Sequence, residues 1–90
     1  MTALDFKSHV LRWAEKIGVS KKISSIHLRR MKNKLASCSS KGRLTFDPSI
    51  LHQHKDRMEE IIVHELLHLR YPNHGKVFKI LLRNYLKDSV

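Results

Sequence analysis

The sequence predicts an α+β fold made of an N-terminal helix, a small sheet, a buried helix and a C-terminal amphipathic helix. Three observations predict it. Apolar residues recur with helical spacing near both ends of the chain, short segments rich in Ile, Leu, Ser and Thr occupy residues 22–46, and residues 58–69 are largely apolar. Because 90 residues enclose one small core, we expect a single domain over residues 1–90.

Residues 3–17 form the first predicted helix. Thr2 or Asp5 can cap its free N–H groups, and Gly18 can end it in the left-handed conformation. Its apolar residues recur every three or four positions and therefore share one face, which we expect to pack on the core. These residues are Phe6, Val10, Trp13, Ala14 and Ile17.

Helical spacing is absent from residues 22–46, and we predict strands there. Ile26 and Leu28 alternate with polar neighbours, which is typical of a half-buried strand. A Ser-Ser-Lys-Gly turn separates residues 35–39 from residues 43–46, and its glycine can adopt a positive φ. These two segments are therefore predicted to pair as a hairpin.

Two more helices are predicted in the second half of the chain. Asp47-Pro48 can open a helix, because Asp accepts hydrogen bonds from free N–H groups and proline at the first position loses none. Either one helix follows, or a short helix and then a long one. Residues 58–69 are apolar nearly all round, which predicts a helix buried on most sides that ends near Arg70, since a proline follows. Residues 76–86 carry an apolar and a basic face and predict the C-terminal amphipathic helix.

Composition narrows the class of protein. No apolar run approaches the roughly 18 residues that a membrane helix needs, so we expect no membrane partner. The N-terminus lacks the basic, apolar and small-residue order of a secretory signal, and we expect a cytoplasmic protein, most simply a monomer. Cys38 is the single cysteine, which excludes an intrachain disulfide and a Cys-based zinc site.

The chain is strongly basic, with a formal net charge of +10. Eight of its 18 Lys and Arg residues, and none of its 8 Asp and Glu residues, lie between residues 20 and 46. This segment therefore predicts attraction to an acidic or phosphate-containing ligand or to nucleic acid. The candidate substrate-binding residues in it are Arg29, Lys41 and Arg43.

Residues 64–68 read His-Glu-Leu-Leu-His and match the H-E-x-x-H pattern inside the predicted buried helix, which is the context that this pattern requires. Residues four apart on a helix lie one above the other, so the His64 and His68 imidazoles can reach one metal ion. Glu65 lies about 100° round the helix from His64, where it can act on a water molecule without binding the metal itself. This arrangement predicts a metal-activated hydrolase.

A catalytic zinc site needs a third protein ligand, and the sequence offers few. After Glu65 the only acidic residue is Asp88, and after His68 the only histidine is His74. Pro72 ends the helix before His74, so that the chain can turn back toward the metal. We therefore expect an open three-histidine site that prefers zinc to magnesium or calcium.

Plainer interpretations of these residues are also open. His64 and His68 could be interior histidines bonded to backbone carbonyl groups, or the metal could be purely structural. Cys38 is interpreted as a small buried side chain and not as a nucleophile, since no histidine neighbours it in the sequence. Four other histidines are interpreted as surface residues, namely His9, His27, His52 and His54.

A longer pattern surrounds the H-E-x-x-H motif. Leu35-Ala36-Ser37-Cys38-Ser39-Ser40-Lys41-Gly42 precedes it, and Pro72-Asn73-His74-Gly75-Lys76-Val77-Phe78 follows it. Over residues 32–78 the chain thereby resembles the core of the YgjP-like metallopeptidases, which are relatives of the SprT-like proteins among the zincins. The family usually has Trp-Gly where this chain has Leu35-Ala36.

This resemblance implies a minimal zincin-like domain of the minigluzincin kind, with an antiparallel sheet packed on the active-site helix. It implies a zinc ion held by His64, His68 and His74, with Glu65 as general base. Residues and resemblance together predict a zinc-dependent hydrolase, foremost a small metallopeptidase that cleaves a peptide or protein substrate with metal-activated water.

A substrate is expected to bind as an added strand. An extended peptide would pair with the hairpin strand that borders the cleft, which we expect to be residues 43–46. Tyr71 and Tyr85 are the candidates for stabilising the oxyanion of the reaction.

Two other functions also fit the sequence. The same metal chemistry beside a basic strand region would suit a nucleotide or another phosphate ester, and some relatives are reported to act on nucleotides. Alternatively, the chain could be a basic nucleic-acid-binding module in which the metal only keeps a small core folded, and such a module would not need Glu65.

Overall fold

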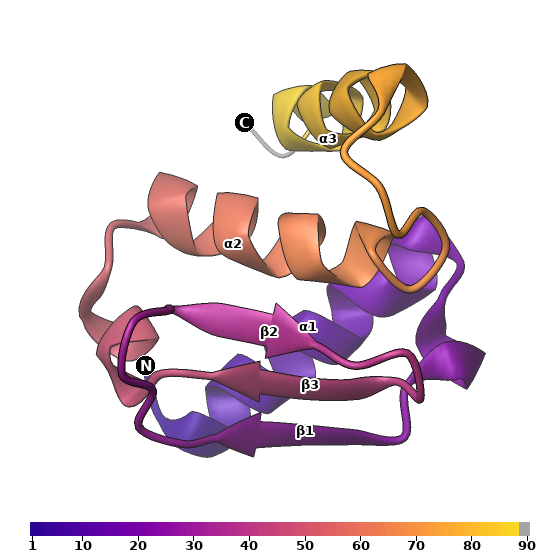
Figure 1. Cartoon of the computed structure of the whole chain (residues 1–90). Helices are drawn as coiled ribbons and strands as arrows, with labels where there is room; N and C mark the ends of the chain where they lie inside the picture. Colours follow the sequence, from indigo (N-terminus) through magenta and orange to yellow (C-terminus); the bar gives the residue numbers. More distant parts are fainter. Residues whose placement is uncertain (89–90) are drawn as a thin grey trace.

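The structure is a computed structural model that describes residues 1–88 of the chain. Its helices are α1 (Ala3–Ile17), α2 (Lys55–Leu67) and α3 (Lys76–Asp88). Its strands are β1 (Ser25–Leu28), β2 (Ala36–Cys38) and β3 (Arg43–Phe46). Two short 3₁₀ helices are η1 (Ser20–Lys22) and η2 (Pro48–His52). Figure 1 shows α2 between the sheet and α3. The predicted α+β fold class is confirmed. Within residues 1–88, no helix combines the length and the hydropathy needed to cross a membrane.

Helix α1 covers the same residues as the predicted helix. Thr2 accepts a hydrogen bond from the Asp5 backbone N–H at 3.1 Å, and the Asp5 side chain accepts one from the Thr2 N–H at 3.5 Å. This reciprocal cap satisfies N–H groups that a helix leaves free at its start. Gly18 ends the helix with a φ of 85°, and all five apolar residues predicted for the core face are buried.

The predicted hairpin forms, but the sheet as a whole is mixed. β2 pairs with β3 in antiparallel orientation, and Gly42 in the turn has a φ of 85°. A side chain at Gly42 would collide with the carbonyl oxygen of Lys22. β1 pairs with the other edge of β3 and runs parallel to it, which gives the strand order β1-β3-β2. The sheet is therefore not wholly antiparallel. Between β1 and β2 the chain crosses from one edge of the sheet to the other, and β3 then inserts between these two strands.

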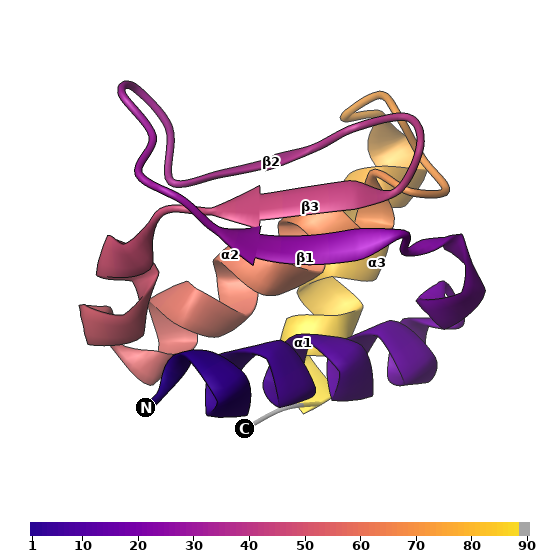
Figure 2. The same cartoon turned by 90° about the horizontal axis from the view of Figure 1, so that it is seen from below.

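The hydrophobic core lies between the sheet and the helices α1 and α2, which Figure 2 shows on one side of the three strands. Leu44 and Phe46 of β3 are fully buried, whereas the alternate residues Arg43 and Thr45 face away from the core. The ring of Phe6 in α1 packs edge-on against Phe46 with the centroids 5.0 Å apart. Helix α2 ends at Leu67, earlier than expected, and contributes six buried apolar residues, namely Met58, Ile61, Ile62, Val63, Leu66 and Leu67.

Glu59 of α2 is a buried charged residue that joins α2 to α1. The residue is 4% exposed, and its Oε1 atom lies 2.8 Å from Nε2 of His9. The Trp13 indole N–H donates to its other oxygen. His9 is therefore half-buried, and its interpretation as a surface residue is wrong, because a buried carboxylate needs a hydrogen-bonding partner. Of the other histidines expected on the surface, His52 and His54 are exposed, and His27 in β1 is half-buried.

We expect Glu59→Ala to lower the free energy of unfolding by roughly 2 kcal/mol, because the ring nitrogens of His9 and Trp13 would lose their buried acceptor. Glu59→Gln keeps one acceptor oxygen and should cost less. Denaturant unfolding measures both effects, with Glu60→Gln as the control, since Glu60 is exposed and its ion pair with Arg57 lies on the surface. If Glu59→Ala were as stable as the control, the role of this contact would be contradicted.

Candidate active site

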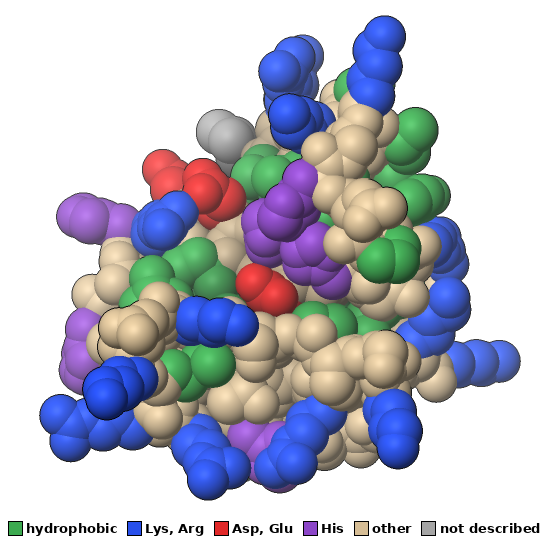
Figure 3. Space-filling model, viewed as in Figure 1, with side chains coloured by type: hydrophobic (Ala, Val, Ile, Leu, Met, Phe, Trp, Pro, Cys, Tyr) green, Lys and Arg blue, Asp and Glu red, His purple; other side chains and the backbone are tan. Residues whose placement is uncertain are grey.

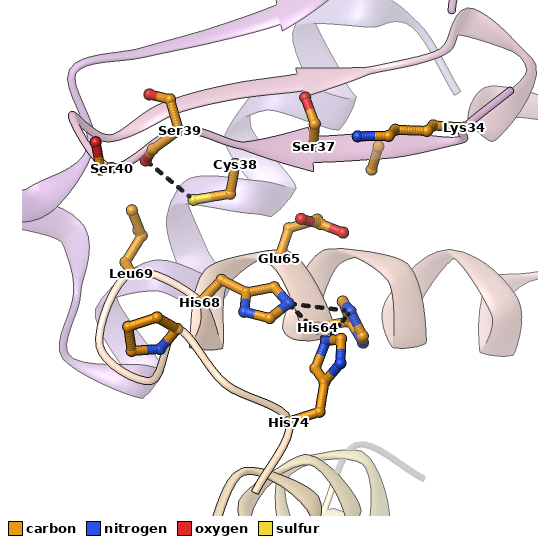
Figure 4. Close-up of a pocket in the computed structure, with 12 residues that line it drawn as sticks. Lys34, Ser37, Cys38, Ser39, Ser40, His64, Glu65, His68, Leu69 and His74 are labelled. Atoms are coloured by element: carbon orange, nitrogen blue, oxygen red, sulfur yellow. Dashed lines mark hydrogen bonds between the residues drawn. The ribbon is translucent and has the colours of Figure 1, made fainter. Parts of the chain in front are cut away.

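Three imidazole rings converge at the C-terminal end of α2. His64 lies in α2, His68 is its C-cap residue, and His74 lies just before α3. Their Nε2 atoms are 3.3 Å apart for His64 and His68, 3.2 Å for His64 and His74, and 2.8 Å for His68 and His74. Figure 4 shows the three rings turned toward one another. The chain thus presents three nitrogen atoms to one point.

These distances suit a shared metal ion. Each Nε2 either donates or accepts, so three mutually close Nε2 atoms cannot all be joined by hydrogen bonds. A tetrahedral ion with metal–nitrogen bonds of about 2.0–2.1 Å places its ligand nitrogens about 3.3 Å apart. Two of the three observed distances match that value, and the three histidines are close enough together to hold one ion. The donor set therefore fits a metal.

The backbone after α2 sets the orientation of His68. The Tyr71 N–H donates to the Leu67 carbonyl oxygen at 2.7 Å, which turns the chain back against the end of the helix. The carbonyl oxygen of Tyr71 then lies 3.2 Å from Nδ1 of His68. If Nδ1 donates to this oxygen, Nε2 is left with its lone pair directed at the other two histidines, as in many metal sites.

Phe78 of α3 lies against all three histidine rings. Its side chain is 2% exposed, and its ring centroid lies 5.2 Å from that of His64, 4.9 Å from that of His68 and 5.0 Å from that of His74. The sequence marks Phe78 as an apolar residue of the last helix and as part of the motif pattern. Its contact with the histidines could not be predicted, because it depends on α3 packing on α2.

Glu65 lies beside the histidine cluster and points toward β2 (Figure 4). Burial raises the pKa of its carboxyl group, and the nearby charges of His74 and Lys34 oppose that shift in part. Burial also lowers the pKa of His64, and the neighbouring histidines add to that effect. The arrangement thus places His64, which burial favours in its neutral form, beside a carboxylate of increased basicity that is suited to accept a proton.

A cleft of about 700 Å³ separates α2 from β2. The three histidines and Glu65 line one side of it, and β2 with the turn that follows lines the other. Figure 3 shows this hollow with a histidine cluster above an acidic side chain. Cys38 also lines the cleft, and its Sγ lies 3.5 Å from the carbonyl oxygen of Ser39. Burial and the charge of Glu65 raise the pKa of the Cys38 thiol to about 11, so it stays protonated, in agreement with its interpretation as a residue that is not a nucleophile.

The basic residues singled out in the sequence lie outside this cleft. Arg29 and Arg43 line a neighbouring hollow, and Lys41 lies in the exposed turn between β2 and β3. None of the three is among the described residues that line the cleft, so their role in substrate binding stays a prediction. Among the described residues, Lys34 is the one Lys or Arg that lines the cleft. Sequence reasoning missed Lys34 because one lysine within a basic segment carries no signal of its own.

The strand that borders the cleft is β2 and not β3. β3 is paired along both edges, so its main chain has no free edge to offer to a peptide. The expectation that residues 43–46 receive the substrate is therefore wrong, and the parallel pairing of β1, which has no local sequence signal, is the reason. Tyr71 and Tyr85, the candidates for oxyanion stabilisation, are not among the described residues that line the cleft.

Almost the whole chain matches one protein family. The model of the YgjP-like family, metallopeptidase domain, matches residues 2–90. The chain belongs to this family. It is also similar to the crystal structure of the metallopeptidase zymogen of Pyrococcus abyssi abylysin, with a TM-score of 0.72 and 29% sequence identity over 83% of this chain and 74% of that chain. No curated protein sequence matches it. The resemblance seen in the sequence is confirmed, and the family is that of a metal-dependent peptidase.

For this YgjP-like domain, replacing His64, His68 or His74 by Ala is expected to weaken metal binding more than the loss of an outer-shell partner does, which costs roughly 10- to 100-fold. The reason is that each of these changes removes one of three direct nitrogen ligands and leaves two. Elemental analysis of the purified variants measures bound metal. Added metal should also raise the melting temperature of the wild type, since it binds the folded state. His52→Ala is the matched control, because His52 is exposed and outside the cluster. Full metal content in His74→Ala would remove that histidine from the ligand set.

Proposed function

We propose that this YgjP-like metallopeptidase binds zinc through His64, His68 and His74 and hydrolyses peptide bonds with Glu65 as general base. The observation that supports it most is the convergence of three Nε2 atoms, the widest pair 3.3 Å apart, beside a half-buried carboxylate in a cleft. Three imidazoles favour zinc over magnesium or calcium and leave one tetrahedral position for water or substrate. Bound zinc would polarise the scissile carbonyl group and lower the pKa of its water to about 7.

The task of Glu65 in this proposal is to move a proton. Its side chain follows His64 in α2 and faces the cleft, where a substrate would lie. Its raised pKa makes it a stronger base than an exposed carboxylate. It would take a proton from the attacking water and deliver it to the nitrogen of the leaving amine. Lys34 in the same cleft is a cation that can offset negative charge there.

The free edge of β2 is the proposed binding surface for the peptide main chain. The Asp47 N–H donates to the Leu35 carbonyl oxygen, and the Ser39 N–H donates to the Arg43 carbonyl oxygen, so residues 35 and 39 face β3. In an antiparallel ladder the direction of the main-chain groups alternates, so the N–H and C=O groups of Ala36 and Cys38 point away from β3. Both residues line the cleft, and an extended peptide can pair with them there.

The two alternative functions have less support. A nucleotide or phosphate-ester hydrolase would need cations around the phosphate, but the basic segment of the sequence contributes Lys34 to the described lining of the cleft and no other Lys or Arg. A nucleic-acid-binding module with a structural metal would not need a half-buried carboxylate beside the histidines. The family assignment also favours a peptidase.

We expect Glu65→Gln to keep the metal and the fold but to lower kcat/KM for peptide cleavage by about a hundredfold to ten-thousandfold, because the amide cannot accept the proton. Cleavage of a peptide library by the zinc-loaded protein measures it, with metal content determined on the same samples. Glu15→Gln is the control, since Glu15 is an exposed residue of α1. Wild-type activity in a metal-replete Glu65→Gln protein would exclude the role as general base.

Strand addition at β2 predicts a period-two response to N-methylation of the substrate. Every second amide of a bound strand faces its partner, and methylation of those amides removes a hydrogen bond and introduces a clash. We therefore expect cleavage to be lost at alternate positions of a peptide methylated one amide at a time and retained at the positions between. Rates measured by mass spectrometry on such a peptide series test this. A response without alternation would mean that the main chain does not bind as a strand.

A further inference from the structure

A second hollow, of about 450 Å³, lies beside the loop of residues 29–35 that joins β1 to β2. Five cationic side chains line it, and no Asp or Glu among the described residues does. We name it the basic hollow, and its cations are Arg29, Arg30, Lys32, Lys34 and Arg43. The basic segment of the sequence thus gathers most of its charge at one place.

The loop that carries four of these cations is anchored to the end of β3. The Arg29 N–H donates to the Phe46 carbonyl oxygen at 2.9 Å. Asp47 holds the rest of the loop, since its side chain accepts from the Met31 N–H and its own N–H donates to the Leu35 carbonyl oxygen, both at 2.8 Å. The hydrogen bond from Met31 is the largest cause that lowers the pKa of Asp47. This carboxylate is therefore charged at neutral pH, and it is hydrogen-bonded to the backbone. The cations therefore project from a fixed loop.

Few acidic groups in the described part of the chain oppose the charge of the basic hollow: Asp47 lies near Arg30, and Glu65 lies near Lys34. None of its five cations forms an ion pair with a residue that the structure describes, although Arg30 is near enough to Asp47 to lower its pKa. Like charges around one hollow repel one another and favour a bound anion. Guanidinium groups can bind a carboxylate through two parallel hydrogen bonds, which suits a ligand with several carboxylates.

The basic hollow adjoins the catalytic cleft. Lys34 and Ser37 line both. Figure 4 shows the Lys34 side chain extending along β2 near Glu65. A chain bound along β2 would therefore meet the basic hollow a few residues from the bond that is cleaved, and one peptide can reach both places.

We propose that the basic hollow is an exosite that binds an acidic segment of the peptide substrate next to the scissile bond. This inference rests on the proposed peptidase function and assigns its substrate class, namely peptides with clustered Asp or Glu. A single-stranded nucleic acid fits less well, because aromatic side chains on which bases stack are absent from the described lining. Its position beside the cleft that would receive a peptide also favours a peptide ligand.

The test measures binding and cleavage separately on the zinc-loaded protein. Hexaglutamate and hexaglutamine carrying the same fluorophore report binding by anisotropy at low and high salt. A peptide that the protein cleaves, extended by six Glu or six Gln residues, reports kcat/KM. The variant is Lys32→Gln with Arg43→Gln in the hollow. The matched control is Lys79→Gln with Arg83→Gln in α3, which removes the same charges from exposed positions outside the hollow.

We expect hexaglutamate to bind and hexaglutamine not to bind, and the hollow variant to weaken hexaglutamate binding about tenfold while the control keeps it. The kcat/KM advantage of the acidic extension should fall in the same way, and that of the neutral extension should not change. If both double variants lost hexaglutamate binding equally, the effect would depend on net charge alone, and the exosite proposal would be overturned. Tighter binding of single-stranded DNA than of hexaglutamate through Lys32 and Arg43 would overturn the assignment to an acidic peptide.

The failures of the two proposals can be told apart. If no peptide is cleaved but hexaglutamate binds through the hollow, the hollow is an anion-binding site. The peptidase proposal and the proposed role of the hollow as a substrate exosite are then both rejected. If peptides are cleaved but the acidic extension gives no advantage over the neutral one, the peptidase stands and the exosite is rejected.

Discussion

The enclosure of α2 is the constraint on which the site depends. This helix packs against α1, β2 and α3, and the apolar residues on those sides are buried. The stripe that remains, with His64, Glu65 and His68, borders the cleft. The packing that stabilises α2 therefore also half-buries these polar groups, and that burial is the main cause of the shifted pKa values of His64 and Glu65. Folding energy and chemical reactivity have the same origin here.

The third histidine depends on how the chain reverses after α2. The turn places the Tyr71 carbonyl oxygen beside Nδ1 of His68, and the following residues return His74 to the end of the helix. Phe78, in the first turn of α3, then fills the space behind the three rings. A metal site built in this way requires α3 to be docked, so its geometry and the packing of the last helix are coupled.

The sheet divides the molecule into two chemical environments. One face carries Leu44 and Phe46 into the core, while the loop that precedes β2 and the outward residue Arg43 supply the basic hollow. The parallel strand β1 occupies one edge of β3 and leaves β2 as the edge along the cleft. Because β2 lies next to both the cleft and the basic hollow, a peptide aligned with β2 would contact the catalytic groups and the cations together.

The sequence by itself determined the local elements and the set of residues that could bind a metal. Helical spacing located α1 and α3, a turn with Gly42 located the hairpin, and H-E-x-x-H with the scarcity of later histidines pointed to His74. These signals are carried by residues close together in the chain, which is why they can be recognised without a structure. The tertiary structure alone decided that β2 borders the cleft, that Phe78 supports the histidines and that His9 pairs with Glu59, 50 positions away. Such contacts depend on how distant segments pack, and no local pattern of residue types encodes that packing.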